Sequence, residues 1–562
     1  GKTMGALYPA IKALGERRID KVVFLTARTT GRLAAESALE TLIRNGLRIR
    51  SITITAKEKI CFYPESACVP EECACAKGHF DRINDALADG LQENALTRQA
   101  VEKIAAGHQV CPFELTLELV NWCDCVICDY NYAFAPGVML QRLFGEEGGA
   151  HAVLVDEAHN MVDRSREMFS ARLDKSPILK LRRRIKEELP GIYRSLGRIN
   201  GWMAAERRRC LENGGSIVSR ELPETLIGRL KDFLQRSEKW LARNKATPFR
   251  ERLLEVFFEM LRFIRIAEGF DVSYAMIEEA SGHELSIKLF CIDPADQLQE
   301  AWKRCRSAVL FSATLTPAGY FQAVLGCGED AKALNLPSPF PPDNLAVFVA
   351  DGISTLYRER ERSCGEVVKA IIDLVGQRQG HYLVFFPSHE YLRMVHEKFL
   401  QESPATEVVF QSSEMSEDQR EAFLERFHRE AGETLVGFAV LGGIFGEGID
   451  LKGERLTGAL IVGVGLPGIC TERDLIRDHY ERKHRFGFEF AYQYPGINRV
   501  LQAAGRVIRS ETDQGVILLI DRRYRESRYR HMLPGGWDAC PVNHKANFKE
   551  KIRRFWGRAV SG

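Results

Sequence analysis

The sequence has no apolar run long enough to cross a membrane. Its longest apolar stretches, such as residues 459–470, reach about a dozen residues and contain glycine and proline, whereas a bilayer-spanning helix needs about 20 apolar residues. No secretory signal opens the chain. We therefore expect a protein without a membrane partner that acts in the cytoplasm.

The chain also has almost no net charge, because 78 Lys and Arg residues face 76 Asp and Glu residues and leave +2. This balance excludes a wholly basic, histone-like nucleic-acid binder. It conceals an uneven distribution: residues 161–250 contain 22 basic and 11 acidic residues, including the runs 182–184 and 207–209. That segment carries +11, so the rest of the chain carries −9. A basic surface of this size suits nucleic-acid phosphates, although a solvated helical face is the alternative for either arginine run.

The composition is otherwise that of a folded protein. Hydrophobic residues at 45% and charged residues at 27% exclude a disordered or collagen-like chain. A length of 562 residues exceeds what one hydrophobic core supports. We therefore expect several domains.

Cysteine is unevenly placed. Eight of the 15 cysteines fall between residues 61 and 128, and the other seven are scattered and expected to be small buried residues. In a long chain with no signal peptide, disulfides are not expected, so a cluster of thiols indicates metal or iron–sulfur ligation. The clustered residues are Cys61, Cys68, Cys73, Cys75, Cys111, Cys123, Cys125 and Cys128.

The first three residues, Gly1-Lys2-Thr3, match the end of the phosphate-binding loop G-x-x-x-x-G-K-[ST]. In such a loop the Lys reaches the terminal phosphates and the Thr hydroxyl holds Mg²⁺. A helical pattern up to Leu14 and an apolar strand at 21–25 follow, which is the order in a nucleotide-binding βαβ fold. We expect the preceding strand and loop glycine to lie upstream, so that the chain is a fragment; the alternative is a chance match.

A second motif follows the apolar run 152–155, which predicts a buried parallel strand. Asp156-Glu157-Ala158-His159 stands at its end, where α/β folds place their chemistry. Asp156 can hold Mg²⁺, and Glu157 can orient and deprotonate the attacking water. A solvated acidic turn is the alternative. Ser312-Ala313-Thr314, after the apolar run 308–311, fits a hydroxyl pair that couples nucleotide state to domain position.

The C-terminal third holds two further signals. Gln502, Arg506 and Arg509 are spaced i, i+4 and i+7, which predicts one face of a helix. Two arginines there can neutralise charge on a γ-phosphate in the manner of arginine fingers, and a salt-bridged surface helix is the alternative. Upstream, the glycine-rich segment 442–450 follows a predicted strand at 435–440, and such a loop lets a backbone approach phosphates closely.

In this order the motifs resemble those of a superfamily 2 helicase. Together with the cysteines they resemble the iron–sulfur branch, the XPD and DinG helicases, with a layout closer to XPD and a bacterial character. The resemblance covers nearly the whole chain except its N-terminal edge, where most of motif I is missing. It implies a nucleotide site that includes Gly1, Lys2, Thr3, Asp156, His159, Gly448 and Asp450, with ATP and Mg²⁺ as cofactors.

The same resemblance implies a [4Fe–4S] cluster, because the cysteines lie between motifs Ia and II, where the XPD family inserts its cluster domain. Its implied ligands are Cys61, Cys68, Cys73 and Cys111, and Cys75 could replace Cys73. Four thiolates alone fit a zinc site equally well. The group at 123–128 is predicted to be buried strand cysteine instead.

The fold class that follows is α/β: two RecA-like parallel-sheet motor domains with an iron–sulfur insertion and a helical arch insertion. Motor domain 1 is expected in three parts, at 1–57, 113–162 and 285–340. The cluster domain is expected at 58–112, the helical arch at 163–284 and motor domain 2 at 341–562.

The resemblance implies an ATP-dependent DNA helicase that moves 5′ to 3′ on single-stranded DNA, driven by ATP hydrolysis between the motor domains. Its expected partner is single-stranded or forked DNA, its role DNA repair or replication, and its state monomeric. The alternatives are a translocase or binding scaffold without unwinding activity, and a redox protein. The nucleotide motifs argue against both, because electron transfer needs no arginine fingers.

Overall fold

The computed structural model covers most of the chain, which forms two compact units. The first unit comprises Gly1–Ser312 and Phe321–Ala331, and the second comprises Ala313–Tyr320 and Lys332–Gly562. The predicted boundary at residue 340 therefore differs from the observed division, because 313–320 and 332–340 group with the second unit. The described residues are 1–66, 68–145, 149–243, 247–427, 433–443, 445, 456–542 and 545–559. Within these ranges, no helix has both the length and the apolar character needed to cross a bilayer.

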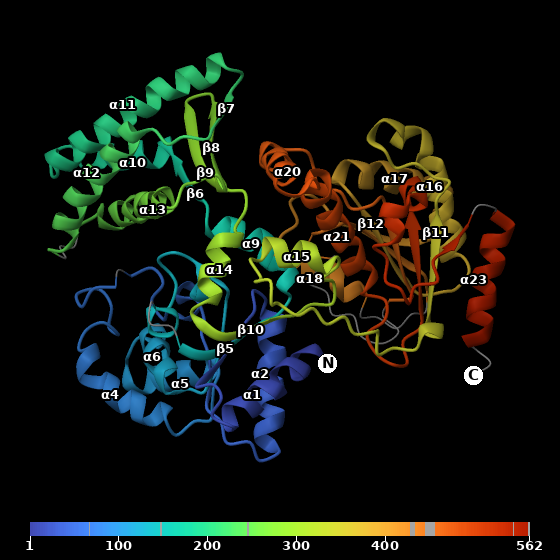
Figure 1. The fold of residues 1–562 in the computed structure, drawn as a ribbon, viewed down its shortest axis with the longest axis horizontal. Helices are drawn as coiled ribbons and strands as arrows, with labels where there is room; N and C mark the ends of the chain where they lie inside the picture. Colours follow the sequence, from blue (N-terminus) through green and yellow to red (C-terminus); the bar gives the residue numbers. More distant parts are fainter. Residues whose placement is uncertain are drawn as a thin grey trace. The chain divides into compact units, whose positions relative to one another are not determined.

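A parallel sheet forms the core of the first unit (Figure 1). In the described residues its order is β10-β5-β1-β4-β2-β3, and each pairing is parallel. The apolar run of β1 is buried on both faces, as in strands covered by helices on each side. The strands predicted from the apolar runs at 21–25, 152–155 and 308–311 are confirmed, with small shifts of their ends. They are β1 (Lys21–Leu25), β2 (Ser51–Thr53), β3 (Ala95–Leu96), β4 (Cys125–Cys128), β5 (Gly149–Val155) and β10 (Cys305–Leu310).

Two helices pack on one face of this sheet. Leu7 and Ile11 of α1 (Lys2–Gly15) and Leu39 of α2 (Thr29–Arg44) share a core with Phe24 of β1 and Leu154 of β5. The helix predicted up to Leu14 is thereby confirmed. Further helices of this unit are α6 (Pro112–Leu119), α7 (Asn131–Phe134), α8 (Gln141–Phe144), α9 (Met161–Met168), α14 (Ala295–Trp302) and, assigned across both units, α15 (Ala318–Val324).

The predicted cluster domain, 58–112, is not separate from the main sheet. Its strand β3 pairs in parallel with β2, with Ser51 opposite Ala95, and so forms the edge of the sheet. The rest of the segment is helical. Its helices are α3 (Lys57–Ile60), α4 (His79–Gly90) and α5 (Arg98–His108).

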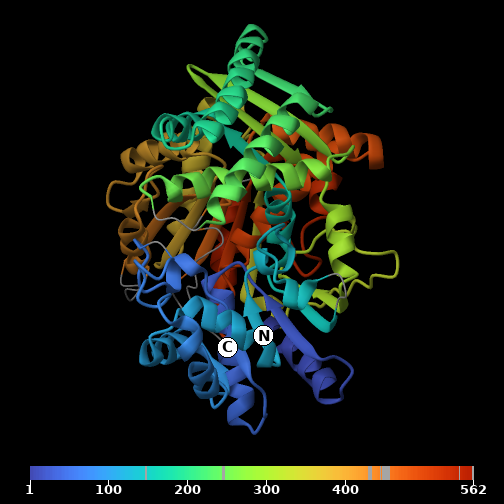
Figure 2. The ribbon, with the colours of Figure 1, turned by 90° about the vertical axis from the view of Figure 1, so that its left-hand side faces the viewer.

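The predicted helical arch contains a sheet that the helical pattern did not indicate. Its strands are antiparallel in the order β6-β9-β8-β7 within the described residues. Helix α11 lies along this sheet and contacts β7, β8 and β9 (Figure 2). Strand β9, the hairpin partner of β8, extends to Cys291, beyond the predicted end of the arch at residue 284. The elements are β6 (Ala171–Asp174), β7 (Ser216–Ser219), β8 (Tyr274–Ser281), β9 (Glu284–Cys291), α10 (Lys175–Arg184), α11 (Pro190–Glu212), α12 (Glu224–Leu241) and α13 (Arg250–Glu268).

The second unit is built on another parallel sheet, ordered β13-β14-β12-β15-β16-β11-β17 in the described residues. Alternate residues of β12 enter two different cores: Leu383 and Phe385 pack in one, Val384 and Phe386 in the other. Helices therefore cover both faces, which confirms the second α/β motor domain. The strands are β11 (Leu345–Ala350), β12 (His381–Phe386), β13 (Glu407–Phe410), β14 (Leu435–Val440), β15 (Gly458–Val462), β16 (Gly515–Ile520) and β17 (Cys540–Pro541). The helices are α16 (Arg360–Val375), α17 (His389–Glu402), α18 (Glu417–Arg426), α20 (Thr471–His484), α21 (Tyr494–Ala504), α22 (Ser527–Arg530) and α23 (Lys545–Ala559).

Candidate functional site

The two predicted catalytic carboxylates stand where β5 ends. The backbone N–H of Asp156 donates to the carbonyl of Leu25 at 2.9 Å, which continues the ladder between β5 and β1 by one residue. Glu157 then turns out of the sheet in a left-handed conformation, with φ 48° and ψ 47°. Asp156 is only 5% exposed. The sheet thus presents both carboxylates at its carboxyl edge, the edge at which open α/β folds bind ligands.

The Glu157 carboxylate has polar contacts with three other side chains. Its carboxylate lies 3.0 Å from Lys2 Nζ and accepts a hydrogen bond from the Ser312 hydroxyl at 3.2 Å. His159 Nδ1 lies 3.3 Å from the same carboxylate and 2.6 Å from Ser312 Oγ. The structure therefore brings together residues that the sequence predicted from three separate motifs.

The two carboxyl groups differ in their protonation behaviour. Burial, followed by the charge of Glu157, raises the pKa of Asp156 to about 6. Burial also acts on Glu157, but Lys2, His159 and Ser312 outweigh it and hold the pKa of Glu157 below its ordinary value. Neighbouring carboxyls with diverging pKa values are typical of sites in which the two groups have separate tasks.

A glycine allows a helix to approach Asp156 closely. A Cβ on Gly31, in the first turn of α2, would lie 2.7 Å from Asp156 Oδ2 and 2.2 Å from Thr26 Oγ1. Any side chain there would displace the carboxylate. The first turn of a helix favours negative charge, so this contact suits an ionised Asp156. Helicase motif Ia, which the family resemblance places at residues 25–29, lies just upstream, but nothing in the sequence alone singled out Gly31.

The remaining phosphate-loop residues open α1. Gly1 precedes the helix, and Thr3 lies in its first turn beside Lys2. In the described part of the chain, the Thr3 hydroxyl makes no hydrogen bond. The structure thus places the cationic Lys2 beside the carboxylates, where the predicted phosphate loop requires it.

The predicted helical face at Gln502, Arg506 and Arg509 is wrong. Helix α21 ends at Ala504, so only Gln502 is helical. Gly505 caps the helix, and Asp513 then shapes the following loop: its Oδ2 accepts the backbone N–H groups of Arg509 at 2.7 Å and of Ser510 at 2.8 Å. Both arginines lie in this turn. Gly448 and Asp450, predicted for the nucleotide site, lie outside the described residues.

The cysteines predicted as ligands come from separate turns. Cys61 ends α3, Cys111 precedes α6, and Cys73 lies in the turns between α3 and α4, where it is buried. Cys68 is exposed.

Arg82 of α4 joins two of these turns. Its guanidinium donates to the carbonyls of Lys77 at 2.7 Å, His108 at 3.0 Å and Gln109 at 2.8 Å. The chain just after Cys75 is thereby fixed to the chain just before Cys111.

The thiols share one neighbourhood. Burial, followed by the charges of Cys73, Cys111 and Cys61, raises the pKa of Cys75 to about 11. Although burial lowers the pKa of Lys57, the thiols of Cys68 and Cys111 hold it above its ordinary value. Among the described residues, however, no group of three or more His, Cys, Asp or Glu side chains is arranged to hold a metal ion. The donors are thiols, as an iron–sulfur cluster requires, but they do not converge on one ion.

The group at 123–128 is structural, as predicted. Cys123, Cys125 and Cys128 are at most 3% exposed in and beside β4. Burial raises the pKa of Cys123 and of Cys125 to about 12. Thiols with pKa values this high stay protonated and bind metal poorly.

Part of the basic segment is structural. Arg182 stacks on Tyr193, with 4.3 Å between its guanidinium carbon and the ring centre. Arg207 donates to the Gly282 carbonyl at 2.6 Å, and Arg209 pairs with the buried Glu278 at 2.9 Å. The exposed members of the two runs are Arg183, Arg184, Arg208 and Arg209, the last of which also pairs with Glu278.

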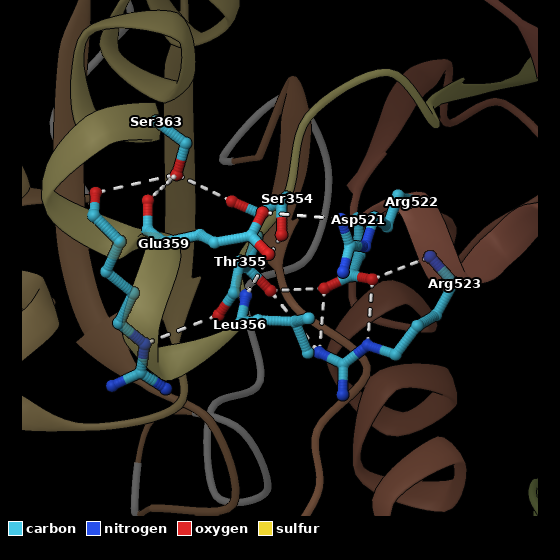
Figure 3. A network of polar contacts seen from close by, with 9 residues as sticks. Ser354, Thr355, Leu356, Glu359, Ser363, Asp521, Arg522 and Arg523 are labelled. Carbon is cyan, nitrogen blue, oxygen red and sulfur yellow. Dashed lines mark hydrogen bonds and ion pairs between the residues drawn. The ribbon is translucent and has the colours of Figure 1, made fainter.

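A buried network in the second unit was not predicted (Figure 3). Asp521 follows β16 and is fully buried. Its carboxylate accepts hydrogen bonds from Arg523 Nε at 2.9 Å and Nη2 at 2.7 Å, and from the Thr355 hydroxyl. Thr355 follows β11, so the network joins two strand ends at the carboxyl edge of the second sheet. An aspartate directly after an apolar run was the available signal.

Two known protein families match this chain, one in each of its two units. The DEAD_2 family matches residues 41–178, and the helicase C-terminal domain family matches residues 371–540. The first match lies in the first unit and the second in the second unit.

Curated relatives are distant. The chain is 20% identical over 440 residues to the ATP-dependent DNA helicase CHL1 of Debaryomyces hansenii, covering 68% of the chain and 54% of that protein. It is 25% identical over 426 residues to the ATP-dependent DNA helicase YoaA of Haemophilus influenzae, covering 71% and 64%. The chain spans between 42% and 64% of the length of four such relatives.

Solved structures share the fold. A structure titled XPD helicase aligns over 96% of this chain and 94% of its own, with a TM-score of 0.61 at 18% identity. The Xpd4 structure of S. tokodaii aligns over 96% and 99%, with a TM-score of 0.53 at 13% identity.

The raised pKa of Asp156 predicts pH-dependent binding of Mg·ATP. Below about pH 6 the carboxyl keeps a proton that must leave before an oxygen can bind Mg²⁺. Affinity for Mg·ATP should therefore rise from about pH 5 to about pH 7 and then level off. Titration of a fluorescent ATP analogue at several pH values measures this, and Asp156→Asn corrects for the titration of ATP itself. Equal pH dependence in the two proteins would contradict the assignment.

Proposed function

Because the chain belongs to the XPD/DinG-like superfamily 2 helicases, we propose that it is an ATP-dependent DNA helicase that moves 5′ to 3′ along single-stranded DNA. The polarity rests on the family resemblance. The observation that carries the proposal is the contact of Lys2, His159 and Ser312 with the Glu157 carboxylate. Three motifs that are far apart in the chain meet at one side chain that can activate water.

Each residue of this group has a distinct task in the proposed reaction. Mg²⁺, when bound with ATP, neutralises phosphate charge. Asp156 supplies the buried carboxylate that holds it. Glu157 orients the attacking water and accepts its proton, for which its low pKa keeps it ionised. Ser312 and His159 fix the direction in which that carboxylate points.

Lys2 links nucleotide binding to the base. Its ammonium pairs with Glu157 at 3.0 Å. The γ-phosphate of an incoming nucleotide carries more charge than one carboxylate, so Lys2 turns toward the phosphate and releases Glu157 for water. Hydrolysis thus begins only after the site is filled. Arg506 and Arg509 then supply positive charge to the transition state.

Replacing Glu157 tests the proposal directly. Glu157→Gln keeps the size of the side chain but cannot accept the proton, so kcat for ATP hydrolysis should fall by about a hundredfold or more. Displacement of a strand from a forked duplex should be lost with it. Both rates are measured on the full-length natural protein.

The matched control is Glu300→Gln, which changes an exposed glutamate of α14 that pairs with Lys303, three residues further on. Unwinding that continues at the normal rate in Glu157→Gln would overturn the proposal. Hydrolysis by the unaltered protein with no strand displacement would instead favour a translocase that does not unwind.

We propose further that Cys61, Cys68, Cys73 and Cys111 hold a [4Fe–4S] cluster, with Cys75 beside them. In such a cluster each thiolate binds a different iron, so the donors stand further apart than around a single zinc ion. What supports the cluster is that these thiols share one neighbourhood. Arg82 stabilises the turns that carry them.

Cys111→Ser tests the cluster. Loss of one thiolate should remove most of the bound iron and the brown absorbance near about 400 nm. Iron content and the absorption spectrum of anaerobically purified protein measure this. Cys470→Ser, which alters an exposed cysteine of the second unit, should change neither. Stoichiometric zinc in the unaltered protein would contradict the proposal.

The proposed DNA contact includes the exposed arginines of the basic segment. Arg183 and Arg184 end α10 and are exposed, unlike Arg182, which packs on Tyr193. Such side chains bind phosphates without reading sequence. The monomeric state, the cytoplasmic location and the role in repair or replication remain predictions.

Replacing both exposed arginines by alanine should weaken binding of single-stranded DNA of any sequence. A plot of log K against log salt concentration has a negative slope, and each lost phosphate contact makes this slope about 0.7 less steep. The double variant should therefore make it about 1.4 less steep. Fluorescence anisotropy at several salt concentrations measures the slope. The control changes Arg18 and Arg44, which are exposed and lie outside the basic segment. An unchanged slope would remove these arginines from the DNA contact.

A further inference from the structure

Tyr130 is a buried tyrosine whose hydroxyl reaches the catalytic turn. It follows β4 and is 0% exposed. Its hydroxyl donates a hydrogen bond to the carbonyl of Asp156 and lies 3.3 Å from the carbonyl of Glu157. Because β1 lies between β4 and β5 in the sheet, this side chain spans the end of β1 to reach the end of β5.

The peptide that Tyr130 contacts is in an unusual conformation. Glu157 has φ 48° and ψ 47°, a left-handed backbone geometry that residues other than glycine rarely adopt. Such a residue keeps this geometry only where its surroundings hold it. Backbone bonds restrain both neighbours: Asp156 N–H donates to Leu25 at 2.9 Å, and Ala158 N–H donates to Phe311 at 3.1 Å. The hydroxyl of Tyr130 restrains the backbone carbonyls of Asp156 and Glu157, which lie between these two N–H groups.

The segment around Tyr130 is itself fixed to the helix that follows the catalytic turn. Arg164 of α9 lies 3.3 Å from Asn131 Oδ1 and 3.5 Å from Asp129 Oδ1. Asp129 in turn accepts the backbone N–H of Asn131 at 2.9 Å. Both chain neighbours of Tyr130, Asp129 and Asn131, are thus hydrogen-bonded to α9, the helix that follows the Asp156–Glu157 turn.

We infer that Tyr130 is a positioning residue for ATP hydrolysis: its hydroxyl holds the Asp156–Glu157 peptide so that the Glu157 carboxylate faces Ser312 and the attacking water. This rests on the proposed function, in which Glu157 is the base. The buried Tyr130 acts through the backbone carbonyls that its hydroxyl contacts. Its effect therefore falls on the chemical step and not on nucleotide binding.

Tyr130→Phe removes the hydroxyl and keeps the ring in the core. We expect kcat for ATP hydrolysis to fall by about tenfold or more, because a small displacement of a catalytic group is costly, while KM for ATP changes less than about twofold. The control is Tyr132→Phe, two residues further on and nearly buried, whose hydroxyl makes no hydrogen bond to another described residue. It should keep the normal kcat. Thermal unfolding of each protein verifies that it is folded.

Two further measurements separate positioning from a structural role. In the Glu157→Gln background, adding Tyr130→Phe should lower the residual rate no further, because both changes act on one group. Replacing Tyr130 by 4-aminophenylalanine restores a donor at the same place and should recover kcat to within about threefold. This variant also keeps the test decisive if Tyr130→Phe does not fold.

The inference is overturned if Tyr130→Phe hydrolyses ATP at the normal kcat, if Tyr132→Phe loses as much, or if Tyr130→Phe lowers the rate equally with and without Glu157. An unaltered protein that hydrolyses no ATP, or a Glu157→Gln protein as fast as the unaltered one, overturns the proposed function as well. If the unaltered protein hydrolyses ATP, Glu157→Gln is slow and Tyr130→Phe is fully active, the inference about Tyr130 is overturned and the proposed function stands.

Discussion

The structure of the site depends on how one peptide is held at the end of a buried strand. In the turn after β5, the backbone N–H groups of Asp156 and Ala158 donate to carbonyls at the ends of β1 and β10, and between them Glu157 adopts a left-handed conformation. That conformation directs its carboxylate toward Lys2 and Ser312. A parallel sheet makes this possible, because the carboxyl ends of neighbouring strands meet at one edge. Without the fixed peptide, the other contacts would have no common target.

Most of the fold could be predicted because it follows from local patterns. Apolar runs bounded by turn residues identified β1, β5 and β14, since strands buried on both faces must be apolar throughout. The same logic located the carboxylates proposed to be catalytic, because Asp156 and Glu157 come directly after such a run. Contact of Lys2 with Glu157 across 155 positions also followed, since a nucleotide fold requires the two motifs to meet.

What the sequence did not indicate depends on neighbours that are distant in the chain. Strands β6 to β9 were missed because helices dominate the periodicity of the segment around them. The spacing of Arg506 and Arg509 suggested a helix, but Asp513 binds the backbone there and favours a loop. Gly31 and Tyr130 owe their importance to contacts with the Asp156 turn, and no spacing in the sequence records such contacts.

We propose that the two adjacent carboxylates have different tasks, Asp156 binding the metal–nucleotide complex and Glu157 activating water. Measuring the affinity for Mg·ATP of Asp156→Asn and Glu157→Gln side by side tests this division. We expect Glu157→Gln to bind Mg·ATP at least as tightly as the unaltered protein, whereas Asp156→Asn should bind it at least about tenfold more weakly. Equal affinities of the two variants would contradict it.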